Sequence, residues 1–122
     1  MPDRIQTCRA QGWRMPPNTV SVARPTIWGN PFSIRAARAS GVEGTDEQIA
    51  GICVESFRVL LTPYGHDIFC FHRPDLKAGR ARILARQPEL RGKHLACWCK
   101  PGCPCHADVL MEMANDPPHP LA

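Results

Sequence analysis

Apolar residues recur every three or four positions in three parts of the chain, which is the spacing of an amphipathic helix. The clearest of these runs follows Thr45 and ends before Pro63, and its apolar positions are Ile49, Ile52, Cys53, Phe57, Leu60 and Leu61. Thr45 and Gln48 have the spacing of a capping box at its first turn. Further helices are predicted over residues 75–87, ending at Pro88, and over residues 106–115.

Shorter apolar runs predict strands between these helices. Residues 4–9 alternate between polar and apolar, residues 19–23 place Val20 and Val22 on one face, and residues 93–99 form an apolar run after Gly92. Residues 68–71 fit a short strand or an apolar turn. Two prolines and a glycine interrupt residues 24–32, so we expect an ordered aromatic loop there, leaving a strand end. Together these elements predict an α/β fold.

The length of 122 residues and a hydrophobic content of 43% fit one domain. We expect that α/β domain over residues 1–115 and a disordered, proline-rich tail over residues 116–122. The formal net charge of +4 is compatible with phosphate-bearing ligands but does not establish nucleic-acid binding. No apolar run is long enough for a signal peptide or a membrane span, so we expect a cytoplasmic protein without membrane contact. The sequence leaves the oligomeric state open.

The seven cysteines are the feature that points most directly to chemistry. Their number is odd, and four of them lie within nine residues: Cys97, Cys99, Cys103 and Cys105. This pattern favours metal binding or thiol chemistry over a disulfide framework. Alternation along the predicted strand places Cys97 and Cys99 on one face and Trp98 on the other. Cys105 and His106 stand where the last helix begins, and a helix start stabilises a thiolate.

Three interpretations of this cluster are open. In the first, zinc is bound by Cys97, Cys99 and Cys105, and His106 or Cys103 completes a tetrahedron. In the second, Cys105 or Cys99 is a reactive thiol, and His106 is its base or contacts the substrate. In the third, the cysteines are buried as small hydrophobic residues and His106 caps the helix. The third interpretation best suits the remaining cysteines, which are Cys8, Cys53 and Cys70.

The aromatic loop carries groups that can hold a nucleobase and its phosphate. Trp28 offers a stacking face, Asn30 an amide that donates and accepts, and Arg24 a cation. The same side chains are equally suited to order a proline-rich loop, with Trp28 in the core. The positive charges between Arg73 and Lys93 fit a solvated helix face or, alternatively, phosphate contact.

Longer motifs stand in a fixed order along the chain: Gly-Trp-Arg-Met-Pro at residues 12–16, Val-Ala-Arg-Pro at 22–25, Trp-Gly-Asn-Pro-Phe at 28–32, Leu-Ala-Cys-Trp-Cys at 95–99 and Cys-His-Ala-Asp-Val-Leu at 105–110. They resemble an uncharacterised bacterial and phage family, domain of unknown function 4326, over residues 4–115. The cysteine and Cys-His elements are also similar to those of domain of unknown function 488, which usually has Arg in place of Ala107. The resemblance implies a small three-layer, Rossmann-like α/β sandwich with a short, mostly parallel sheet. Because both loops follow strands, they could line one pocket.

Two functions follow as hypotheses. The first is a nucleotide- or nucleobase-directed protein, including an enzyme of modified or phage-type nucleic-acid metabolism, with Cys99, Cys105 and His106 as its catalytic centre and the aromatic loop as its ligand contact. The second is a zinc-stabilised module without turnover that binds DNA, RNA or a protein partner. Zinc is the expected cofactor, with Cys97, Cys99, Cys105 and His106 as its ligands; in the first hypothesis the same centre is either reactive or metal-binding.

Overall fold

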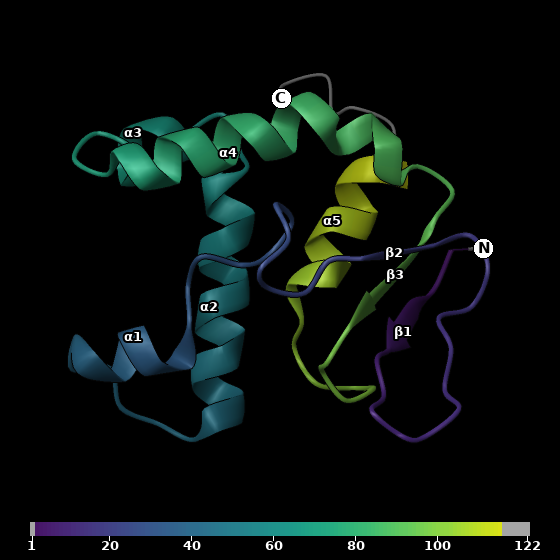
Figure 1. The fold of residues 1–122 in the computed structure, drawn as a ribbon. Coiled ribbons are helices and arrows are strands. Elements are labelled where there is room, and N and C mark those ends of the chain that lie inside the picture. Colours follow the sequence, from purple (N-terminus) through teal and green to yellow (C-terminus); the bar gives the residue numbers. More distant parts are fainter. Residues whose placement is uncertain (1, 116–122) are drawn as a thin grey trace.

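The sheet of this protein consists of three short parallel strands. In the computed structural model, which describes residues 2–115, these strands are β1 (Arg4–Gln6), β2 (Thr19–Ser21) and β3 (His94–Cys97), in the order β1-β3-β2. Leu95 of the central strand lies beside Arg4 on one side and Val20 on the other. Since all three strands run in the same direction, the segments that follow them meet at one edge of the sheet (Figure 1).

Helices make up most of the remaining described structure: α1 (Ile34–Ala39), α2 (Asp46–Leu60), α3 (Gly65–Phe69), α4 (Pro74–Arg86), the 3-10 helix η1 (Gln87–Leu90) and α5 (His106–Asn115). The helices predicted from apolar spacing correspond to α2, α4 and α5, and are confirmed. The Thr45 hydroxyl accepts a hydrogen bond from the backbone N–H of Gln48 at 3.1 Å, and the Gln48 side chain accepts one from the N–H of Thr45 at 2.9 Å. The predicted capping box is therefore present.

Some local predictions were wrong. Residues 68–71 form neither a strand nor a separate turn, because their first two residues complete α3. The helix α1 was not predicted, since its six residues are too few to establish a periodicity; Ser33 caps it by accepting from the N–H of Ala36 at 3.1 Å. Strand β3 ends at Cys97 rather than at residue 99, because the chain turns there toward α5.

The helix α5 lies between the sheet and α2 (Figure 1). Its inner face buries Ala107, Val109, Leu110 and Ala114. These residues share one hydrophobic cluster with Leu95 of β3 and Phe57 of α2, each of which is 0% exposed. Burial on both sides stabilises α5 and fixes its first turn beside the carboxyl end of β3.

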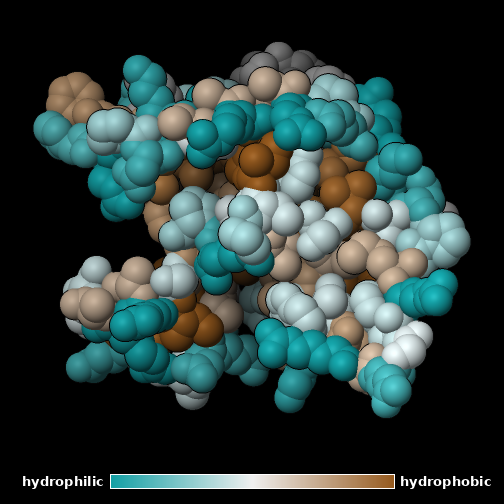
Figure 2. Space-filling view, viewed as in Figure 1, coloured by the Kyte–Doolittle hydropathy of each residue, from teal (hydrophilic) through white to brown (hydrophobic). Residues whose placement is uncertain are grey.

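The predicted α/β class with a short parallel sheet is confirmed. The single domain over residues 1–115 stays a prediction, and the predicted tail over residues 116–122 lies outside the described residues. Figure 2 shows mainly hydrophilic side chains on the face seen in Figure 1, with apolar side chains reaching the surface below α4 and beside α1. Within the part of the chain that the structure describes, no helix combines the length and the apolar character of a membrane crossing.

Candidate metal centre

Three sulfur atoms converge where β3 ends and α5 begins. The Sγ atoms of Cys97, Cys99 and Cys105 all lie within 4.8 Å of one another. Cys97 is the last residue of β3, Cys99 stands in the turn that follows, and Cys105 directly precedes α5. Cys97 and Cys105 are buried with their sulfurs 3.0 Å apart, and Cys99 is partly exposed. The three thiols therefore form one compact group of soft ligands, which could hold a metal ion.

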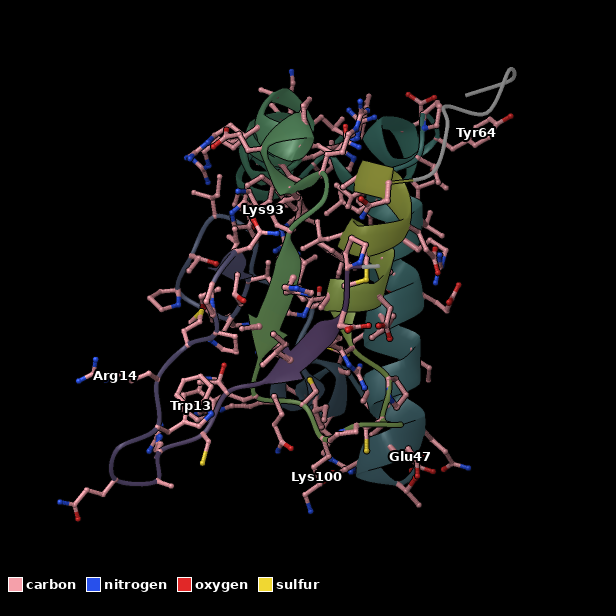
Figure 3. The ribbon with its side chains drawn as sticks, turned by 90° about the vertical axis from the view of Figure 1, so that its right-hand side faces the viewer. Trp13, Arg14, Glu47, Tyr64, Lys93 and Lys100 are labelled. Atoms are coloured by element: carbon pink, nitrogen blue, oxygen red, sulfur yellow. The ribbon has the colours of Figure 1, made fainter. Side chains whose placement is uncertain are left out.

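The turn between these cysteines has a sequence that favours its shape. The N–H of Cys103 donates to the carbonyl of Lys100 at 3.1 Å, with Pro101 and Gly102 between them. Gly102 has a φ of +83°, which glycine adopts without steric cost. Figure 3 shows Lys100 at the same end of the molecule as Trp13 and Arg14, which belong to the loop after β1. The turn thus sits at the edge where the parallel strands end.

Arg4 of β1 fastens this turn to the rest of the fold. Its guanidinium donates to the carbonyls of Cys103 at 2.8 Å and Lys100 at 3.1 Å, and it forms an ion pair of 3.2 Å with Asp108 in the first turn of α5. Only 14% of the Arg4 side chain is exposed. Sequence reasoning missed Arg4 and Asp108, because no local pattern connects a cation in the first strand to a turn almost a hundred residues away.

The charges of the cluster are unequally distributed. Hydrogen bonds from the thiols of Cys105 and Cys97 lower the pKa of Cys99, and the positive charge of Arg4 lowers it further. Hydrogen bonds to Cys105 and Cys99, together with burial, raise the pKa of Cys97. Of these two thiols, Cys99 is therefore the one that ionises more readily. A thiolate is the form of cysteine that binds metals or attacks electrophiles.

His106 lies beside the cluster but does not complete it. Its Nε2 is 2.6 Å from the carbonyl oxygen of Val22. Since a carbonyl can only accept, Nε2 carries the proton, and the lone pair of Nδ1 in the neutral ring can accept from the Cys105 thiol at 3.9 Å. The ring also packs edge-on against Phe57, with centroids 5.6 Å apart. Within residues 2–115, neither His106 nor Cys103 belongs to the group of mutually close metal ligands.

The cluster borders a cavity of about 440 Å³. The three clustered cysteines, His106 and Trp98 line one part of its wall, and Arg24 and Asn30 from the aromatic loop line another. The two loops that follow strands thus border one pocket, as their positions predict. Trp98 is 47% exposed, and the guanidinium of Arg9 lies 4.9 Å from its ring centroid.

The aromatic loop is held by its own polar groups. Asn30 is 6% exposed; its side chain donates to the carbonyl of Cys53 at 3.2 Å and accepts from the N–H of Phe32 at 2.9 Å. Arg24 donates to the carbonyls of Asn30 at 2.7 Å and Phe32 at 3.0 Å. Trp28 is 5% exposed, belongs to the core and does not line the cavity. The indole that lines the cavity belongs to Trp98. The predicted strand places Trp98 on the face opposite the cysteines and so gives no sign of this position.

Several charged side chains away from this site form surface ion pairs, and the cysteines away from it are buried in the core, with the exception of Cys8. Arg73 pairs with Asp75 at 2.8 Å and Arg86 with Glu89 at 2.7 Å, as in a solvated helix face. Cys53 and Cys70 are buried as predicted, and burial raises the pKa of Cys53. The prediction for Cys8 was wrong: it is exposed, because it lies in the loop after β1 outside the core.

Comparison with known proteins gives a family without an activity. The model of the family described as Domain of unknown function (DUF4326) matches residues 5–116. The resemblance drawn from the sequence motifs is therefore confirmed, whereas the similarity to domain of unknown function 488 stays a prediction. No curated protein and no solved structure matches the chain.

Proposed function

The chain belongs to the DUF4326 family, whose description names no activity, and we therefore propose its function from the site itself. Cys97, Cys99 and Cys105 bind a zinc ion beside a cavity for a nucleotide or nucleobase. One observation carries the proposal: three sulfurs close enough to share an ion also border a cavity of about 440 Å³. Structural zinc sites usually have four protein ligands, whereas zinc sites that act on a ligand have three and keep one open position.

The residues of the cluster fit zinc. Thiolates bind zinc at about 2.3 Å, so two of them on one tetrahedral ion lie roughly 3.8 Å apart. All three sulfurs lie within 4.8 Å of one another, and Cys97 and Cys105, whose sulfurs are 3.0 Å apart, would move slightly apart on binding the ion. A zinc ion bound there would supply a Lewis acid that polarises a ligand oxygen or nitrogen. Cys99 already favours the thiolate form, and Arg4 offsets the negative charge of the cluster. His106 holds the start of α5 against the end of β2 through Val22.

The residues that line the cavity suit a flat ligand. Trp98 offers a half-exposed indole, and Asn30 and Arg24 stand on the part contributed by the aromatic loop. Base stacking on an aromatic side chain is a general means of holding a nucleobase. Trp28, which is buried, is not part of the proposed ligand contact.

Metal analysis tests the zinc centre. We expect about one zinc per chain in purified protein, and a large loss of zinc in Cys97→Ser, Cys99→Ser and Cys105→Ser. Cys103→Ser is the matched control, because Cys103 lies in the same turn but outside the cluster. A protein that takes up no zinc on reconstitution, or a control that loses as much zinc as the cluster variants, would overturn the proposal.

A second candidate, a zinc-stabilised module without turnover that binds DNA, RNA or a protein partner, is favoured by a separate observation. Arg24 and Asn30 already use polar groups to order their own loop, which is a sufficient reason for their presence. In that case a chelator unfolds the protein, and no nucleotide binds in the cavity. Thermal unfolding followed by circular dichroism with and without chelator, together with nucleotide titration, separates the two candidates.

A further inference from the structure

The cavity beside the cysteine cluster has an unequal distribution of charge. Arg24 and Arg35 line it, whereas none of its described lining residues is an aspartate or glutamate. The two lining arginines are therefore the groups available to an anionic ligand.

These arginines differ in how firmly they are held. The Arg24 guanidinium donates to two backbone carbonyls, at 2.7 and 3.0 Å, which fixes its charge at the cavity. Arg35, in the first turn of α1, is exposed, and its guanidinium has no hydrogen bond or ion pair in the described part of the chain. An exposed guanidinium with five free donors matches the geometry of a phosphate group.

Resting on the proposed function, we infer that the ligand is a nucleoside monophosphate rather than a free nucleobase or nucleoside, with Arg35 binding its phosphate and Trp98 stacking on its base. Both residues line the same cavity of about 440 Å³, which lies within the range of small-molecule sites. Arg24 contributes a second, fixed positive charge. Arg9 contacts Trp98 from the loop after β1 and limits the freedom of the indole.

Calorimetric titration of the zinc-loaded protein tests this inference. The probes are the common ribonucleoside monophosphates, the corresponding nucleosides and inorganic phosphate alone. We expect at least one monophosphate to bind roughly tenfold or more tightly than its nucleoside, since charge-assisted hydrogen bonds are added. The difference should shrink at high salt, because Arg35 is exposed. Inorganic phosphate should bind more weakly than the monophosphate, since it lacks the stacking contact.

Variants separate the two contacts. Arg35→Gln should remove most of the advantage of the monophosphate and leave nucleoside affinity unchanged, whereas Trp98→Leu should weaken both probes alike. Arg38→Gln is the matched control, because Arg38 lies on the same helix but pairs with Asp46 and does not line the cavity. Equal affinity for nucleoside and monophosphate, or an Arg35→Gln protein that behaves like Arg38→Gln, overturns the inference and leaves the proposed function standing. If neither class of probe binds, the proposed function itself fails.

Discussion

Replacing Arg4 with methionine should weaken both the fold and the metal centre. Methionine retains an unbranched aliphatic side chain in β1 but removes the charge and every hydrogen-bond donor of the guanidinium. Arg4 donates to two carbonyls of the cysteine turn, at 2.8 and 3.1 Å, and each hydrogen bond from a charged group contributes about 1.5–3 kcal/mol. Its ion pair involves Asp108, whose side chain is 49% exposed, and adds at most about 1 kcal/mol.

The expected loss is smaller than the sum of these contacts. The carbonyl of Lys100 belongs to an exposed residue and can bind water instead, so we expect the free energy of unfolding to fall by about 2–4 kcal/mol. Zinc affinity should fall by about 10–100-fold, the usual effect of losing a group that orients metal ligands. Arg4→Lys should recover part of both losses, because an ammonium keeps the charge but not the forked geometry that reaches two carbonyls.

Two measurements check this prediction. Urea unfolding of the metal-free protein gives the stability, and competition with a chelator gives the zinc affinity. Arg14→Met is the control, because Arg14 is exposed and points away from the body of the molecule in Figure 3. If Arg4→Met lowers stability but binds zinc like the wild type, Arg4 only fastens the turn. If neither quantity changes, the reasoning from its contacts is wrong.

Two further predictions concern the thiols and the core. In metal-free protein, hydrogen bonds from Cys105 and Cys97 lower the pKa of Cys99, so its thiolate persists as the pH falls below the usual thiol range. Iodoacetamide at a pH of about 6 should therefore modify Cys99 first, since an ordinary thiol with a pKa of about 8.5 is protonated at that pH. Mass spectrometry of the peptides identifies the modified cysteine, and faster reaction at the exposed Cys8 would contradict the prediction. Phe57→Ala should cost about 3–5 kcal/mol in urea unfolding, because Phe57 is 0% exposed and packs against the ring of His106. The 73% exposed Tyr64 provides the control Tyr64→Ala, and an equal effect of both variants would refute the core assignment.

Local patterns predicted the elements whose causes are local. The helix α2 begins at the residue after Thr45 because a capping box needs only residues within one turn, and its apolar stripe is visible in the sequence itself. The convergence of Cys97, Cys99 and Cys105 also followed from a strand, a turn and a helix that are consecutive in the chain. Short elements such as α1 and α3 were missed or misread, since one helical turn carries too little periodicity to distinguish it from a loop.

The amino-acid sequence by itself determined the main helices, the α/β class and the group of cysteines, because each depends on neighbours a few positions apart. Only the tertiary structure decided which more distant side chains reach that group. Parallel pairing of β1 with β3 brings Arg4 to the carbonyl of Cys103, across 99 positions of sequence. Packing of the core buries Trp28 and leaves Trp98 at the cavity. Contacts of this kind arise from long-range backbone pairing and burial, which no spacing along the chain encodes.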